Sequence, residues 1–312
     1  MSDIYLVTGG AGFIGSHLVE ALVGQGRRVR VLDDFSTGLR SNLAHIQPVP
    51  EILDGDVADA AAVEQAMDGT GVIFHLAALA SVQRSIEKPG DTHRVCATGT
   101  LHVLDAARRA GVRRVVYAAS SSAYGIPAGD VQSENDPLQP LSPYAAAKLA
   151  GELYAQSFTA AYGLETVRLR FFNIFGPRQR ADSPYSGVIA LFAAALTEGR
   201  TPTIFGDGLQ SRDFTFVTDV VQALTRAAEV PSASGQGYNI GTGRGTNLLE
   251  LLAALNRQLG TNIAPRHADA RAGDVRHSRA DISRARRDLG YEPAVAFEDG
   301  LAQTLRWYRQ QG

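Results

Sequence analysis

Three glycines, Gly9, Gly12 and Gly15, separate a short apolar run from a segment with helical periodicity at the start of the chain. The apolar run at residues 4–7 predicts a strand, and residues 16–23 predict a helix. Glycines at such a junction allow a tight turn, close packing of helix on strand and the approach of a pyrophosphate to the helix N-terminus. The spacing departs from the usual three-glycine pattern, so further features are needed to establish a dinucleotide site.

The alternation of strand and helix continues through the first half of the chain. Further strands are expected at residues 28–32, 72–75, 115–118 and 166–170, and helices at residues 92–110 and 144–162. Strands that alternate with helices are typical of a parallel sheet covered on both faces. We therefore predict an α/β fold of the Rossmann type, with a doubly wound parallel sheet.

After about residue 173 the chain changes to longer irregular segments that contain glycine and proline. Helical patterns recur at residues 187–197, 217–229, 247–259 and 297–310. We predict a Rossmann domain over residues 1–172 and a smaller, mixed α/β C-terminal lobe, mainly for substrate binding, over residues 173–312. Segments of the second lobe could cross back and complete the main sheet.

Acidic residues strengthen the dinucleotide interpretation. Asp33 and Asp34 end the second predicted strand, with Asp33 18 residues beyond Gly15. A carboxylate at this place can accept hydrogen bonds from an adenosine ribose diol and repel a 2′-phosphate. Asp56 and Val57 follow a third strand, where a polar group suits the adenine edge. These features favour NAD over NADP as the cofactor.

Tyr144 and Lys148 lie four residues apart in a predicted helix and therefore share one face. A tyrosine phenol has a reference pKa near 10, and nearby positive charges favour its ionised form. Lysine is rare in this chain, since only Lys88 and Lys148 among the 30 basic residues are lysines. We interpret Tyr144 as a general base for an alcohol, with its pKa lowered by Lys148 and with a serine hydroxyl from residues 120–122 bridging to the same oxygen.

Composition argues against several other classes of protein. The 30 basic and 32 acidic side chains give a formal charge of −2, and neither sign forms a long run, which argues against nucleic acid or an anionic membrane as the main partner. No apolar stretch approaches the roughly 20 residues of a spanning helix. The single cysteine, Cys96, and the lack of a basic region before the first apolar run make the cytoplasm the expected location. We predict no metal site.

Taken together, these residues resemble the extended short-chain dehydrogenase/reductases, and in particular the nucleotide-sugar 4-epimerases similar to UDP-galactose 4-epimerase. The resemblance extends over essentially the whole chain. Besides the residues above, it rests on the motifs His75-Leu76-Ala77-Ala78, Arg170-Phe171-Phe172-Asn173, Gly206-Asp207-Gly208 with Arg212-Asp213, and Arg271-Ala272-Gly273-Asp274.

The resemblance implies a reaction in which C4 of a UDP-sugar is oxidised to a ketone by NAD, the keto sugar turns within the site, and the hydride returns to its other face. NAD would then stay bound between turnovers. Tyr144 would be the base, and Lys148 its pKa modulator and a ligand of the cofactor ribose. Counting along the family pattern places the catalytic hydroxyl at Ser120, although Ser121 or Ser122 could take the role because the loop is shorter here.

The resemblance also implies two sets of binding residues. The cofactor would contact Gly9, Gly12, Phe13, Ile14, Gly15, Asp33, Asp34, Asp56, Val57, Leu76, Ala77, Ala78, Tyr144 and Lys148. The substrate would contact Ser81, Ser122, Tyr144, Asn173, Arg212, Arg271, Asp274 and Ser278. Asn173 would bind the sugar diphosphate, Arg212 and Arg271 would clamp its phosphates, and Asp274 would bind the uridine ribose.

Two positions depart from the family pattern. Cys96 stands where an asparagine is common, which puts one cofactor contact in doubt. Ser278 stands where glucose-restricted members carry a bulky tyrosine, which implies more room beside C2 of the sugar. Ser81 lies in a segment, residues 80–85, that looks like its counterpart in the N-acetylhexosamine epimerases. These positions imply that UDP-GlcNAc and UDP-GalNAc are accepted as well as UDP-Glc and UDP-Gal.

Alternatives stay open at the level of the reaction. A UDP-glucuronate or UDP-pentose 4-epimerase uses the same chemistry and differs only in the C5 substituent. A nucleotide-sugar dehydratase would carry an Asp-Glu pair where Ser121 and Ser122 stand, and a noncatalytic NAD-binding sensor is disfavoured by the intact tyrosine and lysine. The family commonly forms homodimers through two helices per subunit, so residues 92–110 and 144–162 are expected to form that contact.

Overall fold

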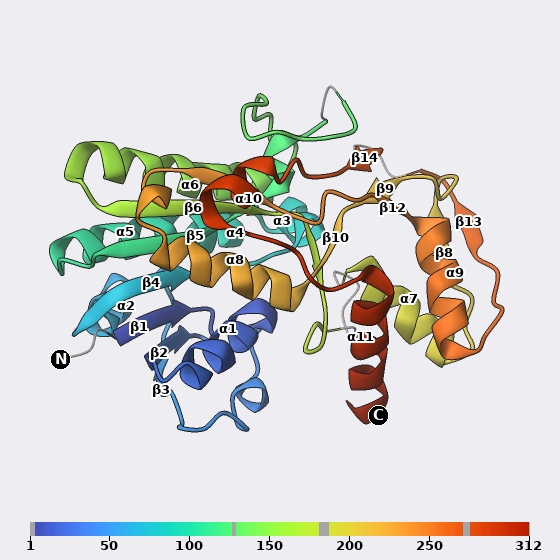
Figure 1. Ribbon diagram of the computed structural model, residues 1–312, viewed down its shortest axis with the longest axis horizontal. Coiled ribbons are helices and arrows are strands. Elements are labelled where there is room, and N and C mark those ends of the chain that lie inside the picture. The colour runs from blue at the N-terminus through green and yellow to red at the C-terminus, as the bar shows by residue number, and fades with distance from the viewer. Residues whose placement is uncertain (1–3, 127–128, 181–186, 271–274, 312) are drawn as a thin grey trace.

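The computed structural model of the chain shows two lobes side by side, a larger one built on a sheet and a smaller one that contains the C-terminal helix (Figure 1). It describes residues 4–126, 129–180, 187–270 and 275–311. Two predicted substrate residues, Arg271 and Asp274, lie outside the described residues.

A seven-stranded parallel sheet forms the larger lobe. Its strands are, in spatial order, β11 (Gly237–Ile240), β6 (Glu165–Phe171), β5 (Arg114–Ser120), β4 (Thr70–His75), β1 (Ile4–Thr8), β2 (Arg28–Asp33) and β3 (Glu51–Asp54). This order is doubly wound, and the predicted Rossmann-type fold is confirmed. Strand β11 comes from beyond residue 173 and pairs with β6, so a late segment completes the sheet. The domain boundary at residue 172 stays a prediction.

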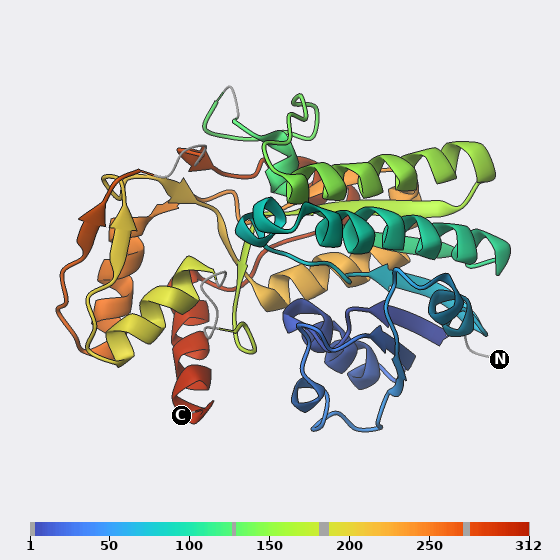
Figure 2. The ribbon, with the colours of Figure 1, turned by 180° about the vertical axis from the view of Figure 1, so that it is seen from behind.

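Helices cover both faces of this sheet, as the two opposite views show (Figures 1 and 2). One face carries α1 (Phe13–Gly24), α8 (Val217–Glu229) and α10 (Ser283–Leu289), and the other carries α2 (Ala60–Ala66), α5 (Gly99–Arg109) and α6 (Pro143–Tyr162). Each face has its own buried apolar core, with Leu18 and Val220 in the first and Val63 and Phe158 in the second. Burial of this apolar surface, at roughly 25 cal/mol per Å², holds the layers together.

The sequence predicts one helix over residues 92–110, and the structure divides this stretch into three segments. The three segments are the end of α4 (Pro89–His93), a π-helical turn at Arg94–Thr98, and α5, which follows without a break. The short helix α3 (Val82–Glu87) precedes α4. Periodicity cannot distinguish a π turn from an α turn over so few residues, so the difference is visible only in space. Such turns occur frequently at functional sites, and this one carries Cys96.

Helix α6 begins where the sequence predicts. The Ser142 side chain accepts a hydrogen bond from the Ala145 N–H, and Pro143 occupies the first turn, where a missing N–H costs nothing. The helix ends at Gly163, whose φ of 72° is the left-handed conformation of a helix C-cap. These signals place Tyr144 in the first turn of the helix, beside the carboxyl end of the sheet.

The smaller lobe has a separate core with three helices and short strands. Its helices are α7 (Val188–Thr197), α9 (Leu248–Leu259) and α11 (Phe297–Gln311). Its strands are β7 (Asn173–Phe175) with β10 (Phe214–Phe216), β8 (Thr203–Phe205) with β13 (Arg266–Ala268), and β9 (Ser211–Arg212) between β12 (Thr246–Asn247) and β14 (His277–Ser278). Phe175 packs edge-on against Phe214, Phe216 and Phe297 in this core.

The remaining elements are single turns, η1 (Arg40–Asn42), η3 (Ser121–Tyr124) and η4 (Pro231–Ala233). Within the described ranges, no helix combines the length and apolar character needed to cross a bilayer. The same ranges hold no group of three or more histidine, cysteine or acidic side chains placed to bind a metal ion.

Candidate active site

A cleft of about 1660 Å³ opens at the carboxyl ends of the parallel strands and extends to the smaller lobe. This edge of an open α/β sheet is the usual place for ligands because the loops that follow the strands converge there. Every predicted site residue within the described ranges lines this cleft. The sequence-based list therefore corresponds to one continuous surface.

The glycine turn at one end of the cleft has no space for side chains. Gly9 has a φ of 70°, and a Cβ atom there would lie 2.7 Å from the Ala77 nitrogen. A Cβ atom on Gly15 would lie 2.1 Å from the Gly9 oxygen. Helix α1 begins at Phe13 without a side-chain cap, and the first N–H groups of a helix lack partners within it. The turn therefore fits the pyrophosphate of a dinucleotide.

Asp33 is the better placed of the two predicted ribose ligands. Its carboxylate accepts hydrogen bonds from the N–H groups of Ala11 and Phe35, at 2.8 and 2.9 Å, and burial raises its pKa. An ionised carboxylate has about four acceptor sites, so two remain for a ribose diol. Asp34 is exposed and accepts from both the N–H and the hydroxyl of Ser36, which closes a local turn.

Asp56 and Val57 lie beyond the end of β3. Burial raises the pKa of Asp56, but the Ala58 N–H and the Arg94 guanidinium outweigh it and hold that pKa below its usual value. Val57 is buried, and a Cβ atom on Gly99 would lie 2.8 Å from its Cγ2 atom. An ionised acceptor beside an apolar side chain suits the polar edge and the flat face of an adenine ring.

The predicted base hydrogen-bonds with one of the three candidate serines. Ser120, at the end of β5, makes a side-chain hydrogen bond with Tyr144. Ser120 and Ser122 share a second hydrogen bond of 2.8 Å between their hydroxyl oxygens, while Ser121 lines the cleft beside them. Ser120 is thus the serine that the structure brings to the phenol, and Ser122 is one hydrogen bond further away.

The expected lowering of the Tyr144 pKa does not arise from the protein's own groups. Burial raises the pKa of the phenol, and the Ser120 hydrogen bond opposes this rise. Lys148 is only 3% exposed, and burial lowers its pKa to about 8. Its ammonium nitrogen lies 4.4 Å from the ring centroid of Tyr117. A base at this position needs additional positive charge close to the phenol.

Cys96 is not part of the cleft lining. The thiol is 1% exposed and packs against Ala147 of α6, and burial raises its pKa. The Cys96 carbonyl accepts a 2.6 Å hydrogen bond from the Thr100 hydroxyl. The residue that departs from the family pattern thus packs between the π-helical turn and α6.

Asp213 connects three predicted substrate residues, which are Asn173, Arg212 and Ser278. The Asn173 N–H donates to the Asp213 carbonyl at 3.0 Å, and the Asp213 N–H donates to the Ser278 carbonyl at 2.8 Å. Arg212 pairs directly with Ser278 in the small sheet. The buried Asp213 carboxylate accepts from the N–H groups of residues 242, 243 and 280. Sequence reasoning missed this role because these partners lie far away along the chain.

Two further arginines of the cleft lining were missed. Arg178 and Arg180 also line the cleft, and their partners belong to the larger lobe. Arg178 has a φ of 67°, which is rare for a residue with a side chain, and pairs with Glu20 and His45. The sequence signal that could have identified them is the pair of arginines directly after Gly176-Pro177. Planar guanidinium groups suit the oxygens of a diphosphate.

A second hydrogen-bond network, here called the Arg170 network, consists of Tyr124, Glu152, Arg170 and Asn239. Arg170 donates to the Glu152 carboxylate, with a shortest distance of 2.7 Å, and to the Tyr124 hydroxyl at 2.8 Å. Tyr124 in turn donates to the Asn239 side chain at 2.7 Å. These bonds connect the turn that follows the candidate serines to α6, β6 and β11.

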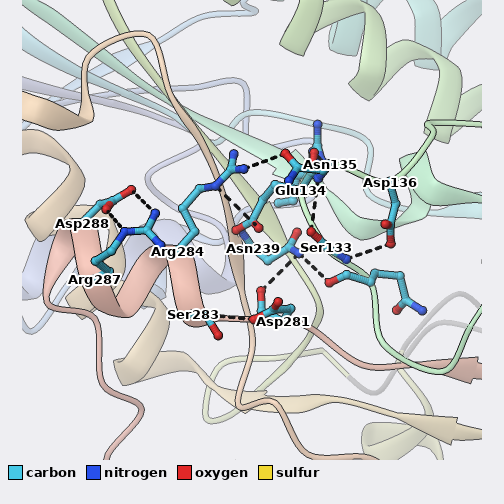
Figure 3. Close-up of polar contacts among 12 residues, drawn as sticks. Ser133, Glu134, Asn135, Asp136, Asn239, Asp281, Ser283, Arg284, Arg287 and Asp288 are labelled. Carbon is cyan, nitrogen blue, oxygen red and sulfur yellow. Dashed lines mark hydrogen bonds and ion pairs between the residues drawn. The ribbon is translucent and has the colours of Figure 1, made fainter.

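Asn239 extends this network to the segments that border the substrate end. Figure 3 shows its side chain between the loop at residues 133–136 and the segment that enters α10. The Asn239 N–H donates to the Glu134 carboxylate, and its amide group donates to the carbonyls of Gln132 and Asp281. Ser278 lies three residues before Asp281, so the serine turn and the substrate segment share one buried junction.

The chain matches the model of the NAD dependent epimerase/dehydratase family over residues 5–241. It is 43% identical to the UDP-glucose 4-epimerase of Mycolicibacterium smegmatis over 317 residues, with 98% of each chain covered. It is similar to the solved structure of the UDP-N-acetylglucosamine 4-epimerase of Methanobrevibacter ruminantium in complex with UDP-N-acetylmuramic acid, at 36% identity, 100% coverage of both chains and a TM-score of 0.95. For the UDP-glucose 4-epimerase of Thermus thermophilus in complex with NAD, the identity is 36%, the coverage 98% and 99%, and the TM-score 0.89.

Proposed function

The chain belongs to the NAD dependent epimerase/dehydratase family, and on that basis we propose that it interconverts the C4 epimers of UDP-hexoses through a 4-keto sugar. It is an NAD-dependent enzyme with a Rossmann-type fold. We propose UDP-GlcNAc and UDP-GalNAc as well as UDP-Glc and UDP-Gal as its substrates.

One arrangement carries this proposal. Tyr144, hydrogen-bonded by Ser120 and followed one turn later by Lys148, lies in a single cleft with the glycine turn on one side and Asn173 and Arg212 on the other. A base between a dinucleotide site and a diphosphate site is what a hydride transfer to and from a nucleotide sugar requires.

The residues of the chain take the following parts in the reaction. Asp33 and the first turn of α1 hold the adenosine ribose and the pyrophosphate of NAD, and Arg212 and Asn173 hold the diphosphate of the sugar. Tyr144 removes the proton from the C4 hydroxyl, and Ser120 donates a hydrogen bond to the same oxygen. When bound, NAD takes up the hydride from C4 and gives it back.

The return step uses the same groups in reverse. Tyr144 gives its proton back to the C4 oxygen after the keto sugar has turned and presented its other face. Because burial raises the Tyr144 pKa, the proton leaves the phenol reluctantly, and the charge of Lys148 together with that of the oxidised nicotinamide must compensate. Because its pKa is about 8, more than half of the Lys148 side chains carry a positive charge below pH 8.

Ser278 and Ser81 support the acceptance of N-acetylated sugars. Both line the cleft and both are half-buried, so their short side chains border the substrate rather than fill its space. A tyrosine at position 278 would add a ring next to the Arg212 strand with which it pairs. A UDP-glucuronate or UDP-pentose 4-epimerase is the second candidate, because the residues that carry the chemistry would be the same.

The test is incubation of the purified protein, without added reductant, with UDP-Glc, UDP-GlcNAc, UDP-GlcA and UDP-Xyl in turn. We expect the C4 epimers of UDP-Glc and UDP-GlcNAc, detected by NMR or chromatography. An epimer of UDP-GlcA or UDP-Xyl alone would assign the second candidate. A 4-keto-6-deoxy product would indicate a dehydratase, and binding of NAD with no turnover would indicate a sensor.

We also propose that the enzyme is a cytoplasmic homodimer. The outward side of α6 exposes apolar side chains, with Leu153 55% exposed and Tyr162 58% exposed. Two helices per subunit, α5 and α6, can form a four-helix contact around a twofold axis. Light scattering of the wild type and of Leu153→Glu tests this, and a monomeric wild type would refute it. The buried, unpaired Cys96 is consistent with a reducing compartment.

A further inference from the structure

Tyr117, in the middle of β5, lies directly beneath the catalytic lysine and has no role in the reaction described so far. Its side chain is 1% exposed. The Lys148 ammonium nitrogen lies 4.4 Å from the centroid of its ring, well within the distance of a cation–π contact. The Tyr117 hydroxyl donates to the Lys148 carbonyl at 3.0 Å. The tyrosine therefore touches both the backbone and the charged end of the lysine.

The tyrosine ring is itself held in place from several sides. A Cβ atom on Gly151 would lie 2.4 Å from the Tyr117 hydroxyl oxygen, so the helix approaches this closely only because residue 151 is glycine. The His75 ring stacks on the Tyr117 ring, with centroids 5.7 Å apart. The His75 nitrogens share hydrogen bonds with the Thr8 and Thr100 hydroxyls, at 2.7 and 3.0 Å. Thr8, His75, Thr100 and Tyr117 are called the His75 network below.

No other group near the lysine forms an ion pair with it in the part of the chain that the structure describes. The titratable groups that face Lys148 from the elements packed around it are His75, Cys96, Tyr117, Tyr144 and Glu152. Burial lowers the pKa of His75 to about 3, so the imidazole is neutral, and burial raises the pKa of the Cys96 thiol, so it is neutral as well. The charge of the Glu152 carboxylate raises the Lys148 pKa from a distance, but the carboxylate itself is bound by the Arg170 guanidinium. The ring face of Tyr117 is the remaining favourable partner on the side of the sheet.

We propose that Tyr117 is a positioning residue of the reaction, whose ring face keeps the Lys148 ammonium charged and aimed along α6 at the base. This inference rests on the proposed function for the importance of Lys148, but the contact itself is independent of the substrate. A buried ammonium without an ion-pair partner is unstable unless other groups stabilise its charge. An aromatic face provides such stabilisation without adding a negative charge beside a phenol that must ionise.

The composition of the chain makes a direct test possible. The protein has only two lysines, so labelling lysine with ¹³C at Cε gives two NMR signals, and the exposed Lys88 serves as an internal reference. Titration of the Lys148 signal is compared in the wild type, Tyr117→Phe and Tyr117→Leu. Tyr238→Leu is the matched control, because Tyr238 is a fully buried tyrosine of the same sheet at β11, away from the lysine.

We expect the pKa of Lys148 to stay near its wild-type value in Tyr117→Phe and to fall by about one unit in Tyr117→Leu, because only the second change removes the ring. The alkaline limb of the epimerase pH profile should move by the same amount. The Tyr238→Leu control should leave both midpoints unchanged. An unchanged or raised Lys148 pKa in folded Tyr117→Leu would overturn the proposal, as would an equal loss in the phenylalanine variant.

A second variant covers the case in which Tyr117→Leu does not fold. Incorporation of 3,4,5-trifluorophenylalanine at position 117 retains the ring and nearly its volume but weakens the negative charge of its face. The Lys148 pKa should then be lower than in Tyr117→Phe, and equal values in the two would refute the cation–π role. These titrations need no turnover, so a protein without epimerase activity would disprove the proposed function and still decide the role of Tyr117.

Discussion

The two networks beside helix α6 differ in charge and in the elements that they join. The His75 network joins β1, β4, α5 and β5, and burial lowers the pKa of His75 to about 3, so the network is neutral at pH 7. The Arg170 network joins η3, α6, β6 and β11, and contains a guanidinium and a carboxylate 2.7 Å apart. One side of the active site is thus held by neutral hydrogen bonds within the cofactor half, and the other by a buried ion pair.

This difference predicts different responses to substitution. Loss of one neutral hydrogen bond in a buried network costs about 1 kcal/mol, whereas loss of one partner of a buried ion pair leaves an uncompensated charge and costs about 3–5 kcal/mol. The neutral network can therefore tolerate the loss of one contact, while the charged network fails as a unit.

The largest effect is expected for Tyr144→Phe, which changes the predicted base and neither network. The variant lacks the hydroxyl that exchanges the proton with C4, so turnover should fall by about 10²–10⁴-fold or more. Both networks stay intact, so NAD and UDP-sugar binding and the unfolding midpoint should remain close to wild type. Steady-state kinetics and isothermal titration of both ligands measure this. Turnover within tenfold of wild type would show that Tyr144 is not the base.

The next largest effect is expected for Arg170→Met in the Arg170 network. The change removes the closer partner of the buried Glu152 carboxylate and leaves only the Arg168 guanidinium beside it, at 3.9 Å, so the free energy of unfolding should fall by up to about 3–5 kcal/mol. The double variant with Glu152→Leu should recover most of the loss because the unpaired charge is gone. Arg257→Met is the control, since its ion pair with Glu298 is exposed and should contribute about 0–1 kcal/mol. Chemical denaturation measures all three.

A loss of less than about 1 kcal/mol in Arg170→Met would remove the distinction between the two networks. It would mean that water or another group reaches Glu152 when the guanidinium is absent. The double variant checks this explanation. If Arg170→Met alone does not lower the free energy of unfolding, adding Glu152→Leu should not raise it.

The cofactor half could be predicted from the sequence because its signals are local. The glycine turn lies within seven residues, and Tyr144 and Lys148 are one helical turn apart, so spacing alone brings them together. The same holds for Asp33, which ends the strand after the first helix. The seven-stranded sheet followed from the alternation of strand and helix, which is the pattern that a doubly wound fold requires.

The contacts that span the chain could not be predicted in this way. Tyr117 is 31 residues from Lys148, and Asp213 is 67 residues from Ala280, so no short window contains both partners. The choice among the three serines depended on which hydroxyl meets the phenol in space. The pKa of Tyr144 depends on burial, which composition and spacing do not reveal.

A smaller effect, and one that depends on pH, is expected from the histidine of the His75 network. Its pKa is about 3 in the folded protein, below the usual value of 6.5, so below pH 6.5 the unfolded chain takes up a proton that the folded chain does not. This residue should therefore lower the free energy of unfolding by about 2 kcal/mol between pH 7 and pH 5. The loss should continue until the pH reaches about 3.

His75→Gln should remove that share of the acid dependence while His93→Gln, at an exposed position, should keep the wild-type slope. His17, whose pKa burial lowers to about 4, should retain its own contribution in both variants. Thermal unfolding at a series of pH values measures the slopes. Identical slopes in the wild type and His75→Gln would mean that the imidazole is protonated in the folded protein, and the His75 network would then not be neutral.

The smallest effect is expected for Thr8→Val, which removes one hydroxyl from the neutral side. The His75 ring loses a 2.7 Å hydrogen bond and the Ala77 N–H loses an acceptor at 3.3 Å, while valine fills nearly the same volume in β1. We expect the free energy of unfolding to fall by about 1 kcal/mol. Thr225→Val in α8 is the control, since that hydroxyl bonds only to carbonyls of its own helix. If Thr8→Val lowered the free energy of unfolding as much as Arg170→Met, the neutral network would be as sensitive to a lost contact as the charged one. Burial rather than charge would then explain the sensitivity of both networks.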